Sequence, residues 1–304
     1  MHVCALCDPG SLVRTVGGGP GAPALRFPEV LEGPKGRAQG GAAVAALGCV
    51  AQRNSAAPGA PLRRITGRLQ RPVPLNAPLD ASVAWDGGNG SVQILDGEVP
   101  AVTGTVETGE PLTVQGLPER LRQAVARMAA VSGAECQGKS IADEDPDPNW
   151  VEPTCYGCSR PRDLGGLFLP GWRVAPDVIA SPFVAEASHR DAEGHLAWPI
   201  AVAATDCSTG ICFSADRDFQ KRLSAEDKAY ITGSLDYYLL RPAPLDGRAY
   251  RVLGTPDGIE GRKMFGAAGL FDEAGTPYVV CEGTWLVIPM PDEWKKSSQP
   301  ASKS

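Results

Sequence analysis

Residues 65–75 read ITGRLQRPVPL, and residues 231–245 read ITGSLDYYLLRPAPL. Both stretches begin with Ile-Thr-Gly and end with Arg-Pro-x-Pro-Leu, at offsets of 166 and 170 residues, so the second stretch is four residues longer. Alternating polar and apolar residues after the glycine are typical of a β-strand. Proline cannot donate a hydrogen bond to a neighbouring strand, and the Pro-x-Pro motif therefore marks the point where each strand ends.

Two further features recur in the same order. A run of small apolar residues precedes each Ile-Thr-Gly, at Gly40–Ala51 and at Ile200–Phe213. A Cys-x-x-Cys pair lies earlier still, at Cys4 and Cys7 and again at Cys155 and Cys158, with an offset of 151 residues. Chance could supply one such match, but four in one order indicate a tandem duplication.

Each copy is predicted to hold one buried helix followed by strands. The helices cover residues 42–53, opened by Gly40-Gly41, and about 199–213, because both runs are apolar on every face. Turn residues such as Asp86-Gly-Gly-Asn-Gly90 separate the strands. Strands are expected at 65–71, 79–85, 91–98 and 100–106 in the first copy, and at about 231–240, 247–254, 261–271 and 277–288 in the second.

A linker separates the two copies. Leu121, Val125, Met128 and Ala129 recur at helical spacing, which predicts a helix packed by one face within residues 117–132. The acidic stretch Asp143–Asp147 is predicted to be a solvated loop rather than a metal site. The predicted organisation is a first domain at 1–116, a linker helix and acidic loop at 117–150, a second domain at 151–292 and a frayed tail at 293–304.

The composition excludes several classes of protein. The chain has 304 residues, 43% hydrophobic and 21% charged, with 35 acidic and 29 basic side chains, which is typical of a folded globular protein. A net charge of −6 argues against a nucleic-acid binder, which needs a basic face for phosphates. The longest apolar run, Gly40–Ala51, is about half the roughly 20 residues that a membrane span needs. Met1–Asp8 carries no secretory signal, so a cytoplasmic location is predicted.

The pattern of one helix beginning at Gly-Gly and followed by antiparallel strands resembles the hot-dog fold, and more closely its acyl-CoA thioesterase branch. In that branch a Cys-x-x-Cys precedes a Gly-Leu-x-Leu stretch, as Cys155–Cys158 precedes Gly166–Leu169 here. A strand ending in Arg-Pro-x-Pro-Leu follows the helix, as it does twice here. The resemblance implies an α+β fold of two tandem hot-dog domains, each a central helix wrapped by an antiparallel sheet, which together form a pseudo-dimer within one chain.

The two copies depart from the family motif in complementary ways. The family helix begins His-Gly-Gly and carries an Asp nine positions after the His. The first copy has Gln39-Gly40-Gly41 and then Gly48 in place of the acid, whereas the second has Ala197-Trp198-Pro199 and then Asp206. Active sites of hot-dog dimers lie at the interface and draw groups from both partners. The resemblance therefore implies one composite site made from the glycines of the first copy and Asp206 of the second.

The chemistry of such a site can be stated from the residues alone. Thioester hydrolysis develops charge on a carbonyl oxygen, which a free backbone N–H at a helix N-terminus stabilises. Gly40 and Gly41 suit that role because glycine permits close approach to the backbone. Asp206, in an otherwise apolar helix, is a costly charge to bury and is predicted to act as general base or nucleophile.

Other residues complete the predicted site. Gln39 is a candidate to bind the thioester or the water, and Ser208 and Thr209 could orient the water. Trp198 is either core packing or a wall of the acyl tunnel. Arg71 and Arg241 are either structural or rim residues that meet a CoA phosphate. A Ser-His-Asp triad is not indicated, since the three histidines accompany no Gly-x-Ser-x-Gly motif.

Three questions stay open at this point. Cys4, Cys7, Cys155 and Cys158 could form one zinc site, although 147 residues separate the two pairs; no cofactor is otherwise implied. The predicted substrate is a thioester of CoA or of an acyl carrier protein, and the alternative is a protein that binds an acyl or polyketide-like ligand without cleaving it, or only a scaffold. The chain could be a monomeric pseudo-dimer or a homodimer.

Overall fold

The first buried helix, α1 (Gly40–Arg53), follows an N-cap residue, Gln39, whose side chain accepts a hydrogen bond from the Ala42 N–H at 2.8 Å. Every residue from Gly40 to Ala51 is buried, which explains why the run is apolar on all faces. The computed structural model describes residues 25–54, 60–144, 155–159 and 166–292. Within these residues, no helix has the length and apolar character that crossing a membrane requires.

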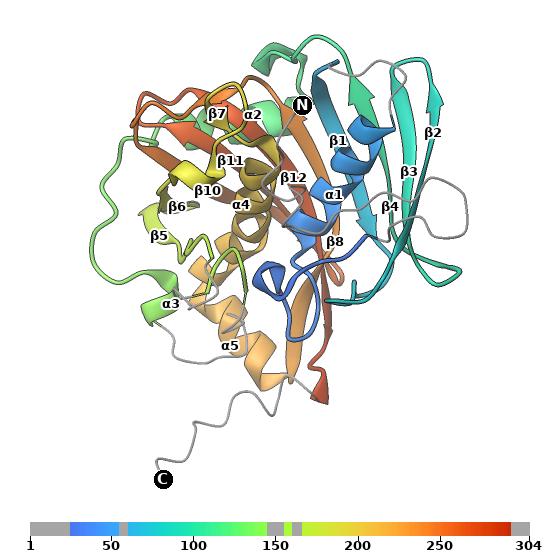
Figure 1. Ribbon diagram of the computed structural model, residues 1–304. Coiled ribbons are helices and arrows are strands. Elements are labelled where there is room, and N and C mark those ends of the chain that lie inside the picture. Colours follow the sequence, from blue (N-terminus) through green and yellow to red (C-terminus); the bar gives the residue numbers. More distant parts are fainter. Residues whose placement is uncertain (1–24, 55–59, 145–154, 160–165, 293–304) are drawn as a thin grey trace.

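One antiparallel sheet of ten strands runs through the described part of both copies (Figure 1). Its order is β2-β3-β4-β1-β8-β12-β11-β10-β6-β5, so each copy contributes one contiguous block. The strands of the first block are β1 (Leu62–Leu69), β2 (Asp80–Asp86), β3 (Asn89–Asp96) and β4 (Val99–Thr108). Those of the second are β5 (Trp172–Ala175), β6 (Val178–Phe183), β8 (Lys228–Leu239), β10 (Tyr250–Glu260), β11 (Lys263–Asp272) and β12 (Pro277–Pro289).

The two blocks meet where β1 pairs with β8, the two strands that carry the repeated Ile-Thr-Gly motif. Arg68 lies opposite Ser234, which is the residue 166 positions later in the chain and hence its own counterpart in the repeat. A residue that pairs with its own counterpart lies on a pseudo-twofold axis. The duplication seen in the sequence therefore forms a pseudo-dimer with a continuous sheet, as predicted.

Two central helices pack side by side on one face of this sheet. The helix α4 (Trp198–Ile211) matches α1 in length, at 14 residues, and lies against it in Figure 1. A side-chain carbon at Gly41 would lie 3.0 Å from the Ala203 Cα, so the small residues of both helices permit their close approach. The predicted α+β architecture, with a central helix in each copy, is confirmed.

The opposite face of the sheet is covered in the second copy by the linker helix α2 (Glu119–Ala129). Its apolar side packs Leu121, Val125 and Met128 against Tyr238, Leu253 and neighbouring strand residues. This confirms the predicted one-sided packing of the linker helix. Two short helices, α3 (Ile141–Glu144) and α5 (Arg217–Ala225), and a ribbon of β7 (His195–Leu196) with β9 (Ala243–Pro244) complete the named elements. The domain boundaries themselves stay a prediction.

The sequence did not predict β5, β6 and α5. Gly171, Pro176 and Pro182 interrupt the β5–β6 region, so it lacks the long alternating pattern by which the other strands were recognised. The helix α5 is short, and its buried positions, Phe219 and Leu223, provide one helical repeat only. Both strands of the pair β5–β6 extend the second block at the edge of the sheet.

Candidate active site

Asp206 lies on α4 with its carboxylate directed at the N-terminus of α1, the helix of the other copy. The backbone N–H of Gly41 donates a hydrogen bond to Asp206 Oδ2 at 2.7 Å, and the Thr232 hydroxyl on β8 donates to Oδ1 at 3.4 Å. The side chain is 1% exposed. The dipole of α1 favours a negative charge at this position. The structure thus brings the predicted acid and the predicted glycines together across the two copies.

Burial dominates the protonation behaviour of this carboxyl group. It raises the pKa of Asp206 from 3.8 to about 7, while the hydrogen bond from Gly41 acts in the opposite direction. A carboxylate with a pKa near neutrality is suited to accept a proton and release it again during turnover. The environment of Asp206 therefore has the electrostatic character of a general base.

The two glycines differ in what their amides do. Gly41 N–H is engaged by Asp206, so it is not free to bind a second oxygen atom. Gly40 is the first residue of α1, and within the described residues its N–H has no acceptor. A side-chain carbon at Gly40 would lie 3.0 Å from Thr232 Oγ1 and 3.1 Å from Asp206 Oδ2. Gly40 therefore leaves both an unused donor and open space beside the carboxylate.

A cavity of about 80 Å³ lies at this point between the copies. It is lined on one side by Gln39 and Gly40, on the other by Asp206 and Thr232, with Trp285 among the apolar lining residues. Water occupies about 30 Å³ per molecule in the liquid, so this volume admits water or a carbonyl group beside Asp206. An acyl chain requires the larger volume typical of ligand pockets and would extend outside the cavity.

Gln39 lines the cavity, and both polar atoms of its side chain also contact the protein. Its Oε1 caps α1 through Ala42 N–H, and its Nε2 donates to the Ala203 carbonyl at 2.9 Å and to Cys207 Sγ at 3.6 Å. These contacts join the start of α1 to α4 and engage both polar atoms of the Gln39 side chain. We interpret Gln39 as the residue that holds the two helices in register around Asp206.

The other predicted side chains lie elsewhere. Ser208 faces β10, where its carbonyl oxygen would be 2.3 Å from a side-chain carbon at Gly254. Thr209 Oγ1 donates to the Asp206 carbonyl and accepts from Trp285 Nε1, both at 2.7 Å. Arg71 and Arg241 are exposed beyond the ends of β1 and β8. None of these side chains lines the Asp206 cavity, and Cys4 and Cys7 lie outside the described residues.

Trp198 belongs to the pseudo-symmetric counterpart of this site. The first residues of α4 are Trp198 and Pro199 where α1 has Gly40 and Gly41, and proline has no N–H to donate. At the position corresponding to Asp206, α1 has Gly48, and a side-chain carbon there would lie 2.6 Å from the Trp198 ring. The indole Nε1 donates to Gln52 Oε1 at 3.3 Å. The second site therefore has neither the acid nor a counterpart of the Gly41 amide.

Thr232 was singled out in the sequence only as part of the repeat. The matching residue Thr66 instead lies on the opposite face of the sheet, hydrogen-bonded to Thr105 Oγ1 at 2.7 Å. The cause is a β-bulge: Ser234 pairs with Thr284, but Thr232 pairs with Trp285, so Gly233 is left without a partner residue on β12. An added residue reverses the direction of the side chains that follow. Strand periodicity alone could not reveal this.

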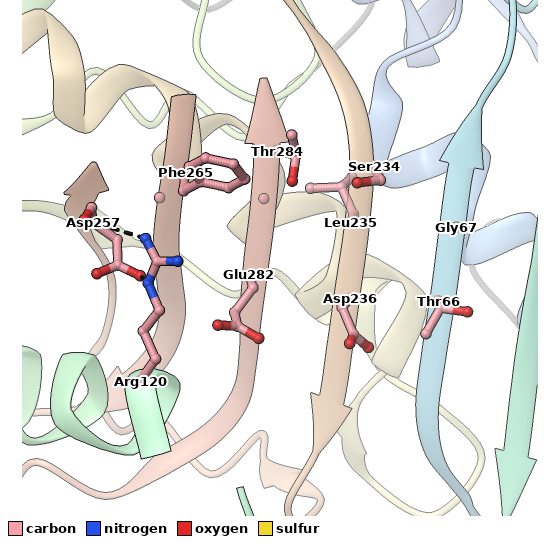
Figure 2. Close-up of a pocket in the computed structure, with 12 residues that line it drawn as sticks. Thr66, Gly67, Arg120, Ser234, Leu235, Asp236, Asp257, Phe265, Glu282 and Thr284 are labelled. Atoms are coloured by element: carbon pink, nitrogen blue, oxygen red, sulfur yellow. Dashed lines mark hydrogen bonds and ion pairs between the residues drawn. The ribbon is translucent and has the colours of Figure 1, made fainter. Parts of the chain in front are cut away.

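A larger cavity, of about 370 Å³, lies on the α2 side of the sheet. Figure 2 shows Glu282, Asp236 and Thr66 in a row on β12, β8 and β1, with Arg120 entering from α2 and contacting Asp257. Asp236 is ion-paired with Arg64 at 2.6 Å. Side chains alternate along a strand, so Asp236 points away from the helices that its neighbour Tyr237 contacts. This cavity shares no lining residue with the one beside Asp206 and is separate from it.

Comparisons with known proteins identify the architecture. No protein-family model matches the sequence, and no curated protein matches it. Among solved structures, a candidate thioesterase II from Thermobifida fusca is similar with a TM-score of 0.56 at 15% identity, over 94% of this chain and 99% of that chain. A conserved protein of unknown function with a hot-dog fold from Alicyclobacillus acidocaldarius matches with a TM-score of 0.53 at 10% identity, over 87% and 92%.

A third similar structure has a different chemistry. The dehydratase domain of PpsC from Mycobacterium tuberculosis matches with a TM-score of 0.50 at 14% identity, over 83% of this chain and 84% of that domain. The chain therefore has the hot-dog fold in its double form, as predicted. Because thioesterase and dehydratase folds match it about equally well, the fold does not choose between their reactions, and the argument for function has to come from the site.

Proposed function

We propose that this protein hydrolyses thioesters of coenzyme A or of an acyl carrier protein at a single composite site between its two hot-dog halves. The observation that carries the proposal is the contact of Asp206, from the second copy, with the N-terminus of α1, from the first, beside the unused amide of Gly40. Histidine is the side chain that most often serves as a general acid or base in enzymes. No histidine lines the Asp206 cavity in the described part of the chain.

In the proposed reaction the thioester carbonyl oxygen accepts a hydrogen bond from Gly40 N–H. Asp206 removes a proton from a water molecule in the cavity as that water attacks the carbonyl carbon. The N-terminal dipole of α1 and the Gly40 amide stabilise the negative charge on the tetrahedral intermediate. The carbon–sulfur bond then breaks, and the proton held by Asp206 neutralises the departing thiolate. Thr232 keeps the carboxylate oriented through its hydroxyl group.

Thiol release from short, long and aromatic acyl-CoAs tests this proposal. Wild type should turn over at least one acyl class, and Asp206→Asn should lower its rate by roughly a hundredfold or more, the scale expected for loss of a general base. Ser208→Ala is the matched control, since Ser208 is a buried polar residue on the same helix that faces away from the cavity. An Asp206→Asn rate equal to that of the control would refute the role of Asp206.

One observation favours a second function, the binding of an acyl ligand without hydrolysis. Asp206 also serves as an acceptor for the first turn of α1, and such a contact stabilises the helix pair whether or not catalysis occurs. The same panel separates the two functions. Absence of turnover on every thioester, together with tight acyl-CoA binding, would support the binding protein and exclude the hydrolase.

A further inference from the structure

Three cysteine side chains meet beside the candidate active site. Cys155 and Cys158 come from the loop before β5, and Cys207 comes from α4. Their sulfur atoms all lie within 4.8 Å of one another, with Cys155 Sγ and Cys207 Sγ 3.5 Å apart. All three side chains are buried and line the same 80 Å³ cavity as Gln39 and Asp206. The mechanism proposed above uses none of these thiols, and the contacts between α1 and α4 use only Cys207, which accepts from Gln39 Nε2.

The backbone around the cysteines is fixed independently of any bond between them. Tyr156 N–H donates to the Glu32 carbonyl at 2.6 Å, and Leu169 N–H donates to the Gly157 carbonyl at 2.9 Å. A side-chain carbon at Gly157 would lie 2.6 Å from Cys207 Sγ, so only glycine lets the loop approach α4 this closely. The loop therefore presents the two sulfur atoms of its Cys-x-x-Cys motif to the third.

The geometry agrees with that of a tetrahedral thiolate site. Four ligands at the usual zinc–sulfur distance of about 2.3 Å are separated from one another by about 3.8 Å. The 3.5 Å separation of Cys155 Sγ and Cys207 Sγ is close to that value, whereas a disulfide would require the two atoms to approach to about 2.05 Å. Thiolate ligands select soft or borderline ions such as Zn²⁺ over Mg²⁺ or Ca²⁺.

Residues that bind zinc are usually held in place by hydrogen bonds from neighbouring side chains, and Gln39 is placed to provide one. Gln39 Nε2 donates a hydrogen bond to Cys207 Sγ at 3.6 Å, and such bonds to a ligand atom orient it and compensate part of its charge. The described residues provide three sulfur ligands, and the shared cavity gives water access to the remaining position. We propose that Cys155, Cys158 and Cys207 bind one Zn²⁺ ion through three thiolates, which fastens the 155–158 loop to α4. This differs from the site predicted from the sequence, because Cys207 joins the second pair.

Zinc binding by the full-length chain tests this proposal. Reduced protein is stripped with a chelator, given Zn²⁺ and desalted, and bound zinc per chain is measured by elemental analysis. Wild type should retain one zinc per chain, and Co²⁺ in its place should show thiolate-to-metal charge-transfer absorption. Cys207→Ala should lose the retained metal, whereas Cys212→Ala, a buried cysteine five residues further along, should keep it. Circular dichroism establishes that both variants are folded.

Three results would overturn the proposal. Zinc that wild type loses on desalting, or that Cys207→Ala retains, would show that the three thiols are not its ligands. Loss of zinc in a Cys4→Ser, Cys7→Ser double variant would instead favour the four-cysteine site predicted from the sequence. All readouts are of metal content and spectrum, so an inactive protein would still give an answer, and failure of the hydrolase proposal would not affect this one.

Discussion

Asp206 of the second copy accepts a hydrogen bond from Gly41 of the first copy, so one side chain links the two copies. A buried carboxylate loses most of its hydration, and here one backbone N–H and one hydroxyl are the only hydrogen-bond donors to it within the described residues. The resulting pKa of about 7 means that folding and ionisation of this group oppose one another. Functional sites commonly retain such destabilising groups. The free-energy cost of burying the Asp206 carboxylate is therefore itself an indication of a functional site.

This opposition predicts how Asp206→Asn changes stability with pH. Between pH 3.8 and about 7 the folded protein holds a proton on Asp206 that the unfolded chain releases, so the stability of wild type falls as pH rises through this window. The asparagine variant has no such loss. In chelator-treated protein, its free energy of unfolding should exceed that of wild type by up to about 4 kcal/mol above pH 7, and the gap should close toward pH 4.

Urea denaturation of both proteins at a series of pH values measures this gap. A gap that does not change between pH 4 and pH 8 would show that the pKa of Asp206 is not raised in the folded protein. A destabilised variant at all pH values would show that the Gly41 contact depends on the charge of the carboxylate.

The neighbouring glycines provide a second test at the same scale. Gly40→Ala places a methyl group 3.0 Å from Thr232 Oγ1 and 3.1 Å from Asp206 Oδ2, inside the cavity. It should lower thiol release by about a hundredfold, the scale expected when a reacting group is displaced by an ångström, while the protein stays folded. Gly41→Ala meets Asp206 Cβ at 2.7 Å and the Ala203 backbone at 3.0 Å, and should lower stability by about 1–3 kcal/mol.

Rates normalised to folded protein, with thermal unfolding beside them, distinguish these two effects. Equal loss of stability in both variants would indicate that Gly40 is a packing residue only and would remove the argument that it leaves room for substrate.

The helices on the two faces of the sheet differ in what they contact. The helices α1 and α4 lie on the face that holds Asp206, and α2 covers apolar residues on the other face. The sheet therefore separates the side that holds the candidate active site from the side that α2 covers. Arg64 on β1 pairs with Asp236 on β8 at 2.6 Å, across the seam between the copies, and with Glu107 on β4 of its own copy at 3.3 Å. These ion pairs are partly exposed and are expected to contribute little to stability.

The role of α2 can be tested at its most buried residue. Met128 is fully buried in the cluster that α2 forms with β10, β11 and β12. Met128→Ala should lower the free energy of unfolding by about 2–5 kcal/mol, because it leaves a cavity there. The rate of thiol release per folded molecule should stay at the wild-type value, because α2 lies across the sheet from Asp206. A lower rate at unchanged stability would contradict this separation of the two faces.

Much of this division could be predicted from the sequence. The repeat gave the seam, because paired strands of a pseudo-dimer carry the same motif, and the Gly-Gly start of one helix and the acid of the other indicated where the copies meet. The rest depended on contacts between distant segments. The bulge at Gly233 turns Thr232 toward Asp206, and the loop packing brings Cys207 to a cysteine pair 49 residues earlier. Neither the bulge nor the packing of the loop changes the periodic pattern of polar and apolar residues in the sequence.

The position of Trp198 shows the same limitation of local patterns. From the sequence alone, Trp198 is either core packing or a wall of the acyl tunnel. A helix of 14 residues is about 21 Å long, however, so its two ends serve different sites. Trp198 lies at the counterpart site, with its ring beside Gly48, and lines a cavity of about 330 Å³ there together with Arg241, whereas Asp206 belongs to the other site.

At the scale of the whole molecule, the two positions related by the pseudo-twofold axis are no longer equivalent. Only one of them combines an acid with a glycine-rich helix N-terminus. In a symmetric hot-dog dimer both helix N-termini would face an acid. Here α1 offers glycines to Asp206, whereas α4 begins with Trp198, whose ring lies against Gly48, and with Pro199, which has no N–H. A single chain thus contains both halves of the proposed site, which does not require a second copy. The proposed function therefore requires that one chain binds one thioester at the Asp206 cavity.

The most direct test is a calorimetric titration with a non-hydrolysable thioether analogue of the preferred acyl-CoA. Wild type should bind one analogue per chain, Trp198→Ala should bind the same number, and Gly40→Ala should bind at least tenfold more weakly because its methyl group occupies the carbonyl position. Two analogues bound per chain would contradict a single composite site. One analogue bound with unchanged affinity in Gly40→Ala would show that the ligand lies elsewhere.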